Sequence, residues 1–228
     1  MSSFENLPHI LVLISGTGTN LQALIDATTA SPPRINAKIC HVIANLAQKA
    51  KPGLERARKV GIPTSVRALK SYKDQVPSKY PDQAAARQSY DADLARYILN
   101  DIQRPDLVVC AGWMHILAPA FLAPMKAAGI PIINLHPALP GAFNGAHAIE
   151  RAFEEFKAGV ITKTGVMIHY VIEEVDEGQP IVVKEIEIQA NDTLSSLETR
   201  IHEVEHKAIV EGTNIALKAL REGKESGG

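Results

Sequence analysis

Residues 9–22 read HILVLISGTGTNLQ, which joins an apolar run to a glycine-rich turn and the start of a helical pattern. Further short apolar runs, most of them followed by a turn and a helical pattern, lie at residues 39–44, 64–66, 107–110 and 132–135. Strands that alternate with helices in this way are typical of βαβ units in a parallel sheet with helices on both faces. We therefore predict a doubly wound fold for the N-terminal half.

The C-terminal part follows a different pattern. Two strand-like runs, residues 165–172 and 181–188, are separated by an acidic turn, which predicts an antiparallel hairpin added to the sheet. A helical pattern covers residues 194–220, with Asp192 or Thr193 as its cap. The predicted fold class is thus α/β: a doubly wound, mostly parallel sheet with a C-terminal antiparallel hairpin and a long final helix. We expect one domain over residues 1–222 and a disordered tail at residues 223–228.

Charge and hydrophobicity narrow the range of partners. The chain has 228 residues, 24 of them Lys or Arg and 25 Asp or Glu, so a surface that neutralises many nucleic-acid phosphates is not expected. Its apolar runs are too short to cross a bilayer, and the N-terminus lacks the pattern of a secretion signal. We expect a cytoplasmic protein, either monomer or homodimer, that acts on small molecules without nucleic acid or membrane.

The two cysteines suggest no special chemistry. Cys40 and Cys110 both lie inside apolar runs and belong to no spacing of metal ligands. We expect both to be buried free thiols in a reducing compartment and predict no metal site.

The turn at Gly16 and Gly18 lies where backbone N–H groups and a helix dipole meet an anion. A dinucleotide site is disfavoured because Leu21 stands where its third glycine would be, and a triphosphate loop because no Gly-Lys-Ser/Thr follows. A single phosphomonoester fits better. The alternative is a tight turn without a ligand, with Asn20 as the helix cap.

Asn134 and His136 are two residues apart at the end of an apolar run, so their side chains share one face of a strand. The carboxyl ends of strands in open α/β sheets are where ligands bind. Asp176 lies in the predicted hairpin turn. Each also has an ordinary interpretation, respectively a turn-forming Asn, a structural His and a solvated turn carboxylate.

Four segments together are more specific than any one of them: residues 15–22 (SGTGTNLQ), 111–119 (AGWMHILAP), 134–137 (NLHP) and 169–178 (HYVIEEVDEG). In order and approximate spacing they resemble the phosphoribosylglycinamide formyltransferase family, in its monofunctional, fungal type. The resemblance extends from about His9 to Leu220.

This resemblance implies a reaction and a set of site residues. The reaction moves a formyl group from 10-formyltetrahydrofolate, as co-substrate, to the amine of 5-phosphoribosylglycinamide in purine biosynthesis. The implied catalytic residues are Asn134, His136 and Asp176. The implied acceptor-binding residues are Thr17, Gly18, Thr19, Asn20, His202, Glu203, Val204 and Glu205. The implied folate-binding residues are Arg87, Met114, His115, Ile116, Leu117, Ile172, Glu173, Glu174 and Val175. Many relatives carry Arg in place of His115.

The predicted catalytic residues suit formyl transfer, which passes through a tetrahedral intermediate. The Asn134 amide and a protonated His136 can donate to the oxyanion, and Asp176 should raise the pKa of His136. We expect Cys110 to be part of the core and His147 and His169 to be structural or rim residues. Alternatives are a methionyl-tRNA formyltransferase, a formyltetrahydrofolate hydrolase and a non-catalytic phosphate-binding module.

Overall fold

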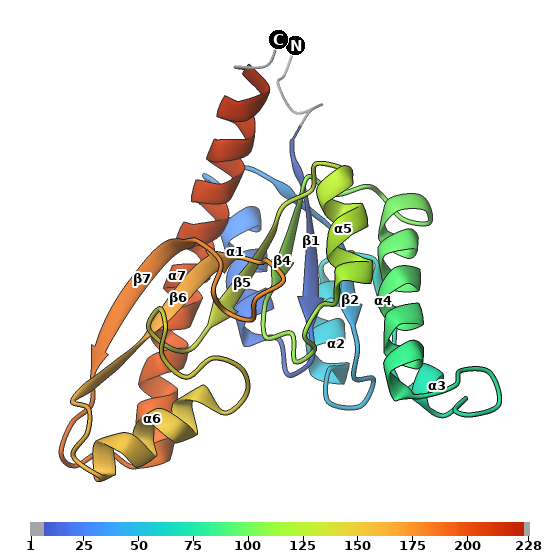
Figure 1. The fold of residues 1–228 in the computed structure, drawn as a ribbon. Coiled ribbons are helices and arrows are strands. Elements are labelled where there is room, and N and C mark those ends of the chain that lie inside the picture. Colours follow the sequence, from blue (N-terminus) through green and yellow to red (C-terminus); the bar gives the residue numbers. More distant parts are fainter. Residues whose placement is uncertain (1–6, 226–228) are drawn as a thin grey trace.

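A single seven-stranded sheet forms the centre of the computed structural model, which describes residues 7–225 (Figure 1). Its strand order is β3-β2-β1-β4-β5-β6-β7. The strands are β1 His9–Ile14, β2 Lys38–Ala44, β3 Thr64–Val66, β4 Leu107–Cys110, β5 Ile132–His136, β6 Lys163–Tyr170 and β7 Pro180–Glu187. The first five are parallel, whereas β6 and β7 are antiparallel additions. The predicted fold class is confirmed.

Helices cover both faces of the sheet because the side chains of its central strands alternate between two apolar cores. Ile10, Val12 and Ile14 of β1 belong to one core, and Leu11 and Leu13 to the other. The first core is covered by α1 Thr19–Thr29, α2 Lys51–Lys59 and α7 Leu194–Glu225, and the second by α4 Gln83–Asn100 and α5 Pro119–Ala127. Two further helices are α3 Lys70–Lys73, next to α4, and α6 Ala148–Lys157, which contacts α7 (Figure 1).

Several element boundaries differ from the predictions by one to a few residues. Strand β6 ends at Tyr170 rather than at residue 172, because the chain turns into the loop before β7, and β7 itself is shifted by one residue. Thr193 caps α7, since its hydroxyl accepts a hydrogen bond from the backbone N–H of Ser196 at 3.1 Å.

The final helix runs to Glu225, beyond the predicted end at residue 220. Arg221 donates to the carbonyl of Asn36 at 2.9 Å, and Lys218 pairs with Glu222 one turn away at 3.7 Å. The first three residues of the predicted frayed tail are therefore helical, and residues 226–228 lie outside the described part.

Both cysteines are buried free thiols, as predicted, and burial raises the pKa of Cys40 to about 11 and that of Cys110 to about 12. Within residues 7–225, no cluster of three or more His, Cys, Asp or Glu side chains has an arrangement that could hold a metal ion. None of the described helices is both long and apolar enough to cross a membrane.

Candidate active site

A cavity of about 630 Å³ lies at the carboxyl ends of β1, β4 and β5, where the loops that follow these strands meet the loop between β6 and β7. We call it the central cavity. It brings together most of the predicted site residues, although they come from five separate parts of the chain. Those that line it are Thr17, Thr19, Asn20, Met114, His115, Ile116, Leu117, Asn134, His136, Ile172, Glu173, Glu174, Val175, Asp176, His202 and Glu205.

Asn134, His136 and Asp176 converge in this cavity. The Asp176 carboxylate lies 3.4 Å from His136 Nδ1 through one oxygen and accepts from Asn134 Nδ2 at 3.4 Å through the other. The backbone N–H of Gly145 donates to the same carboxylate at 2.8 Å. Asp176 has a positive φ of 59°, so the hairpin loop adopts an uncommon backbone conformation at this residue. The three side chains predicted as a catalytic set therefore form one connected group.

The protonation of this group differs from the prediction in one respect. Burial lowers the pKa of His136, and the nearby Asp176 charge raises it only in part. Asp176 thus has the predicted effect on the His136 pKa, but burial outweighs it because His136 is only 4% exposed, so the neutral form is favoured over the predicted protonated one. Burial also opposes ionisation of Asp176, but hydrogen bonds from His169 and Gly145 outweigh it and hold the pKa of this carboxyl below its usual value.

His169 belongs to the same group, although the sequence suggested only a structural or rim role. It is 2% exposed, and its Nε2 lies 3.2 Å from Asn134 Nδ2 and 3.4 Å from Asp176 Oδ1. Its Nδ1 lies 2.9 Å from the Tyr170 carbonyl, which orients the ring so that Nε2 faces both Asn134 and Asp176. The signal that would have found it is the β5–β6 register, which pairs His169 with Asn134.

At one end of the cavity, the glycine turn opens α1. Gly18, with φ 74°, occupies the N-cap position without a side-chain cap, so the alternative in which Asn20 caps the helix is wrong. Asn20 instead donates to Glu205 of α7 at 3.1 Å, and both are buried. Burial raises the pKa of Glu205, and the Asn20 bond opposes this shift.

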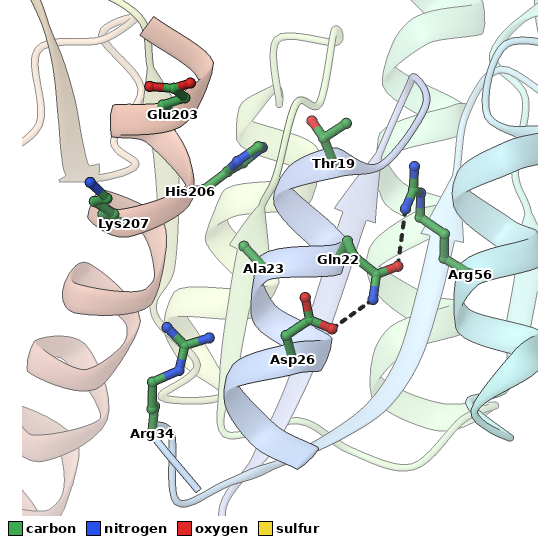
Figure 2. A pocket seen from close by; sticks show the side chains of 9 residues that line it. All are labelled: Thr19, Gln22, Ala23, Asp26, Arg34, Arg56, Glu203, His206 and Lys207. Atoms are coloured by element: carbon green, nitrogen blue, oxygen red, sulfur yellow. Dashed lines mark hydrogen bonds between the residues drawn. The ribbon is translucent and has the colours of Figure 1, made fainter. Parts of the chain in front are cut away.

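Three predicted acceptor-binding residues do not line the central cavity. Gly18 packs closely against Gly53 of α2. Glu203 faces a separate hollow between α1 and α7 (Figure 2). Val204 packs on the first apolar core. On a helix, residues three apart share a face, whereas residues one and two apart do not. His202 and Glu205 therefore both reach the cavity, and Glu203 and Val204 point elsewhere.

The other end of the cavity is more apolar. Met114 and Ile116 are 67% and 51% exposed, an unusual degree for large apolar side chains beside a cavity. His115 points instead to Asp91, a fully buried carboxylate, at 2.8 Å. Arg87 does not line the cavity. Its guanidinium donates a hydrogen bond to the Ile116 carbonyl and lies 3.9 Å from Asp91, so it stabilises the segment from Met114 to Leu117.

Comparison with known proteins identifies the family of this chain. Residues 8–213 match the family model described as formyl transferase. The chain belongs to the formyl transferase family. Phosphoribosylglycinamide formyltransferase of Schizosaccharomyces pombe is 52% identical to this formyl transferase over 202 residues, which cover 89% of this chain and 93% of the relative. The protein of the same name from Dictyostelium discoideum is 48% identical over 209 residues, which cover 91% of this chain and 97% of the relative.

Solved structures of other proteins have a similar fold to this formyl transferase. Phosphoribosylglycinamide formyltransferase from Bacillus halodurans has a TM-score of 0.75 and 29% identity, with 92% of this chain and 95% of that chain covered. The resemblance to phosphoribosylglycinamide formyltransferases is thereby confirmed, and with it the prediction that the chain is a transferase enzyme.

Proposed function

We propose that this enzyme transfers the formyl group of 10-formyltetrahydrofolate to the amine of 5-phosphoribosylglycinamide, a step of purine biosynthesis. The observation that carries the proposal is the position of Asn134, His136 and Asp176 between two unlike ends of one cavity. One end offers a helix N-terminus and a buried carboxylate, and the other offers exposed apolar side chains.

The acceptor fits the glycine-turn end. Backbone N–H groups at the start of α1 suit its phosphate, since the first turn of a helix leaves such donors unpaired. Glu205, held by Asn20, is placed to accept hydrogen bonds from ribose hydroxyls or the glycinamide. Thr17 and Thr19 add hydroxyl groups to the same end.

The donor fits the other end. Its flat pteridine ring needs apolar contacts together with backbone hydrogen bonds, and the cavity is lined by Ile172 and Val175 of the β6–β7 loop as well as by Met114, Ile116 and Leu117. Arg87 is near enough to this segment to attract a carboxylate on the folate tail.

The chemistry then follows from the protonation states. Burial favours neutral His136, and its Nε2 is buried and has no hydrogen-bond partner within residues 7–225. As the amine nitrogen attacks the formyl carbon, the carbonyl electron pair moves onto oxygen, and the neutral imidazole takes the proton from the amine. Asp176, beside Nδ1, stabilises the resulting imidazolium. The imidazolium then protonates the folate nitrogen as its bond to the formyl carbon breaks.

Asn134 is the candidate donor to the oxyanion. Its amide nitrogen faces both His169 and Asp176, which hold the side chain in position. Stabilising the oxyanion requires one amide hydrogen to turn from these neighbours toward the formyl oxygen.

The test is turnover by the purified protein with both substrates, monitored as formation of the deformylated folate. The matched control is Asn134→Ala, which removes the amide and whose fold is checked by circular dichroism. Release of formate without an acceptor would indicate a hydrolase, and formylation of methionyl-tRNA alone would indicate the other transferase. Either outcome, or no consumption of donor, would overturn the proposal.

A further inference from the structure

A second cavity of about 530 Å³ lies between α1 and α7, and we call it the outer hollow (Figure 2). Thr19, at the start of α1, lines both this hollow and the central cavity, and no other residue between 7 and 225 does so. The outer hollow therefore adjoins the central cavity at the start of α1, beside the glycine turn.

The two cavities differ in charge. The central cavity is lined by four carboxylates, those of Glu173, Glu174, Asp176 and Glu205, and by none of the described Lys or Arg side chains. A phosphate dianion would meet net negative charge there. All the Lys and Arg side chains that line either cavity, Arg34, Arg56 and Lys207, belong to the outer hollow, against two acids.

The cations of the outer hollow outnumber its acids by one, and none of the three forms an ion pair with a residue between 7 and 225. Arg34 and Lys207 have no ion pair or side-chain hydrogen bond with any residue between 7 and 225. Arg56 donates to Gln22 Oε1 (Figure 2) and to the Thr17 carbonyl, both at 3.1 Å, so it borders the glycine turn and has no acidic partner among residues 7–225. His206 turns its ring into the hollow, and its buried Nε2 has no partner within the same described residues (Figure 2).

We propose that the outer hollow is a second phosphate site, in which Arg34 and Lys207 bind the phosphate of the acceptor before it reaches the glycine turn. This rests on the proposed function for the identity of the acceptor. The site supplies the positive charge that the central cavity lacks, and Arg56 continues it to the turn. A charged ligand is concentrated by unpaired cations at the mouth of its site, and salt screens this attraction.

Binding is tested with ribose 5-phosphate, and with ribose as the control that lacks the phosphate, by NMR titration of the full chain at about 10 mM salt. Ribose 5-phosphate should shift signals of the glycine turn and also those of Arg34 and Lys207. The variant Arg34→Gln/Lys207→Gln should lose the outer shifts and bind about five- to twentyfold more weakly. The control variant is Lys126→Gln, because Lys126 is exposed on α5 and has no ion pair within residues 7–225. It should bind ribose 5-phosphate with the same affinity and the same shifts as wild type.

Turnover gives a separate readout. At low salt, the double variant should lose about five- to twentyfold in kcat/KM for the acceptor, mainly through KM, and the loss should vanish at about 0.5 M salt. Wild-type shifts confined to the glycine turn, or equal affinities of the double variant and wild type at low salt, would overturn the second site. If wild type bound ribose 5-phosphate in both places but did not formylate, the proposed function would fail and the second site would stand.

Discussion

The contact between Gly18 and Gly53 yields a quantitative prediction about the glycine turn. A Cβ added at Gly18 would lie 2.7 Å from Gly53 Cα, and Gly18 also has a φ of 74°. A Cβ at Gly53 would meet Ile14 Cδ1 at 2.7 Å, without a positive φ. Gly61 has a φ of 75° and nothing within 4 Å of its added Cβ. Alanine at these positions therefore separates backbone strain from crowding.

The expected losses follow from these two terms. Gly61→Ala should lose about 1–2 kcal/mol, the cost of a left-handed conformation for a residue with a side chain. Gly53→Ala should lose about 1–3 kcal/mol to crowding, partly offset by about 0.5–1 kcal/mol of better helix propensity. Gly18→Ala carries both costs, about 2–5 kcal/mol. Each kcal/mol corresponds to about 2–4 °C in Tm for a chain of this size.

Thermal and urea unfolding followed by circular dichroism measure the stabilities, and calorimetry measures acceptor affinity. Gly18→Ala should be the least stable of the three and should bind the acceptor more weakly, because the turn must move away from α2. Gly61→Ala should bind normally. A Gly18→Ala protein as stable as Gly61→Ala, with unchanged acceptor affinity, would show that contact with α2 does not require glycine at residue 18.

Other predictions concern the central cavity. Asp176→Asn should lower the pKa of His136 further, which NMR titration of the ring measures. The double variant Asp176→Asn/His136→Ala should lose less kcat than the product of the two single losses, and a multiplicative loss would mean that the two residues act independently. Because burial raises the pKa of Glu205, its charge costs stability once the pH rises above the usual carboxyl value, so Glu205→Gln should raise Tm at about pH 8 but not at about pH 4. The same variant should weaken acceptor binding about tenfold by calorimetry, and equal Tm gains at both pH values would contradict this account. His169→Phe should lose about 1–3 kcal/mol of stability by urea unfolding, since Asn134 and Asp176 both lose the polar partner at Nε2, and should reduce kcat at least tenfold; full activity would rule out a positioning role.

Local pattern predicted much of the fold and the centre of the site. Apolar runs bounded by turns mark strands because a buried strand must be apolar, and the five parallel strands lie within a residue of their predicted positions. Asn134 and His136 share a face because side chains alternate along a strand, and both do line the cavity. These properties depend on neighbours in the chain, which a single sequence displays.

Properties that depend on partners distant in the chain could not be read in this way. His169 joins Asn134 only through the register of two antiparallel strands, and Asn20 turns from the helix cap to Glu205 because α7 packs beside α1. The direction of the His136 pKa shift depends on how deeply the ring is buried as well as on the adjacent charge. The outer hollow gathers cations from a loop and two helices, so its charge arises from packing, because residues 34, 56 and 207 meet only in three dimensions.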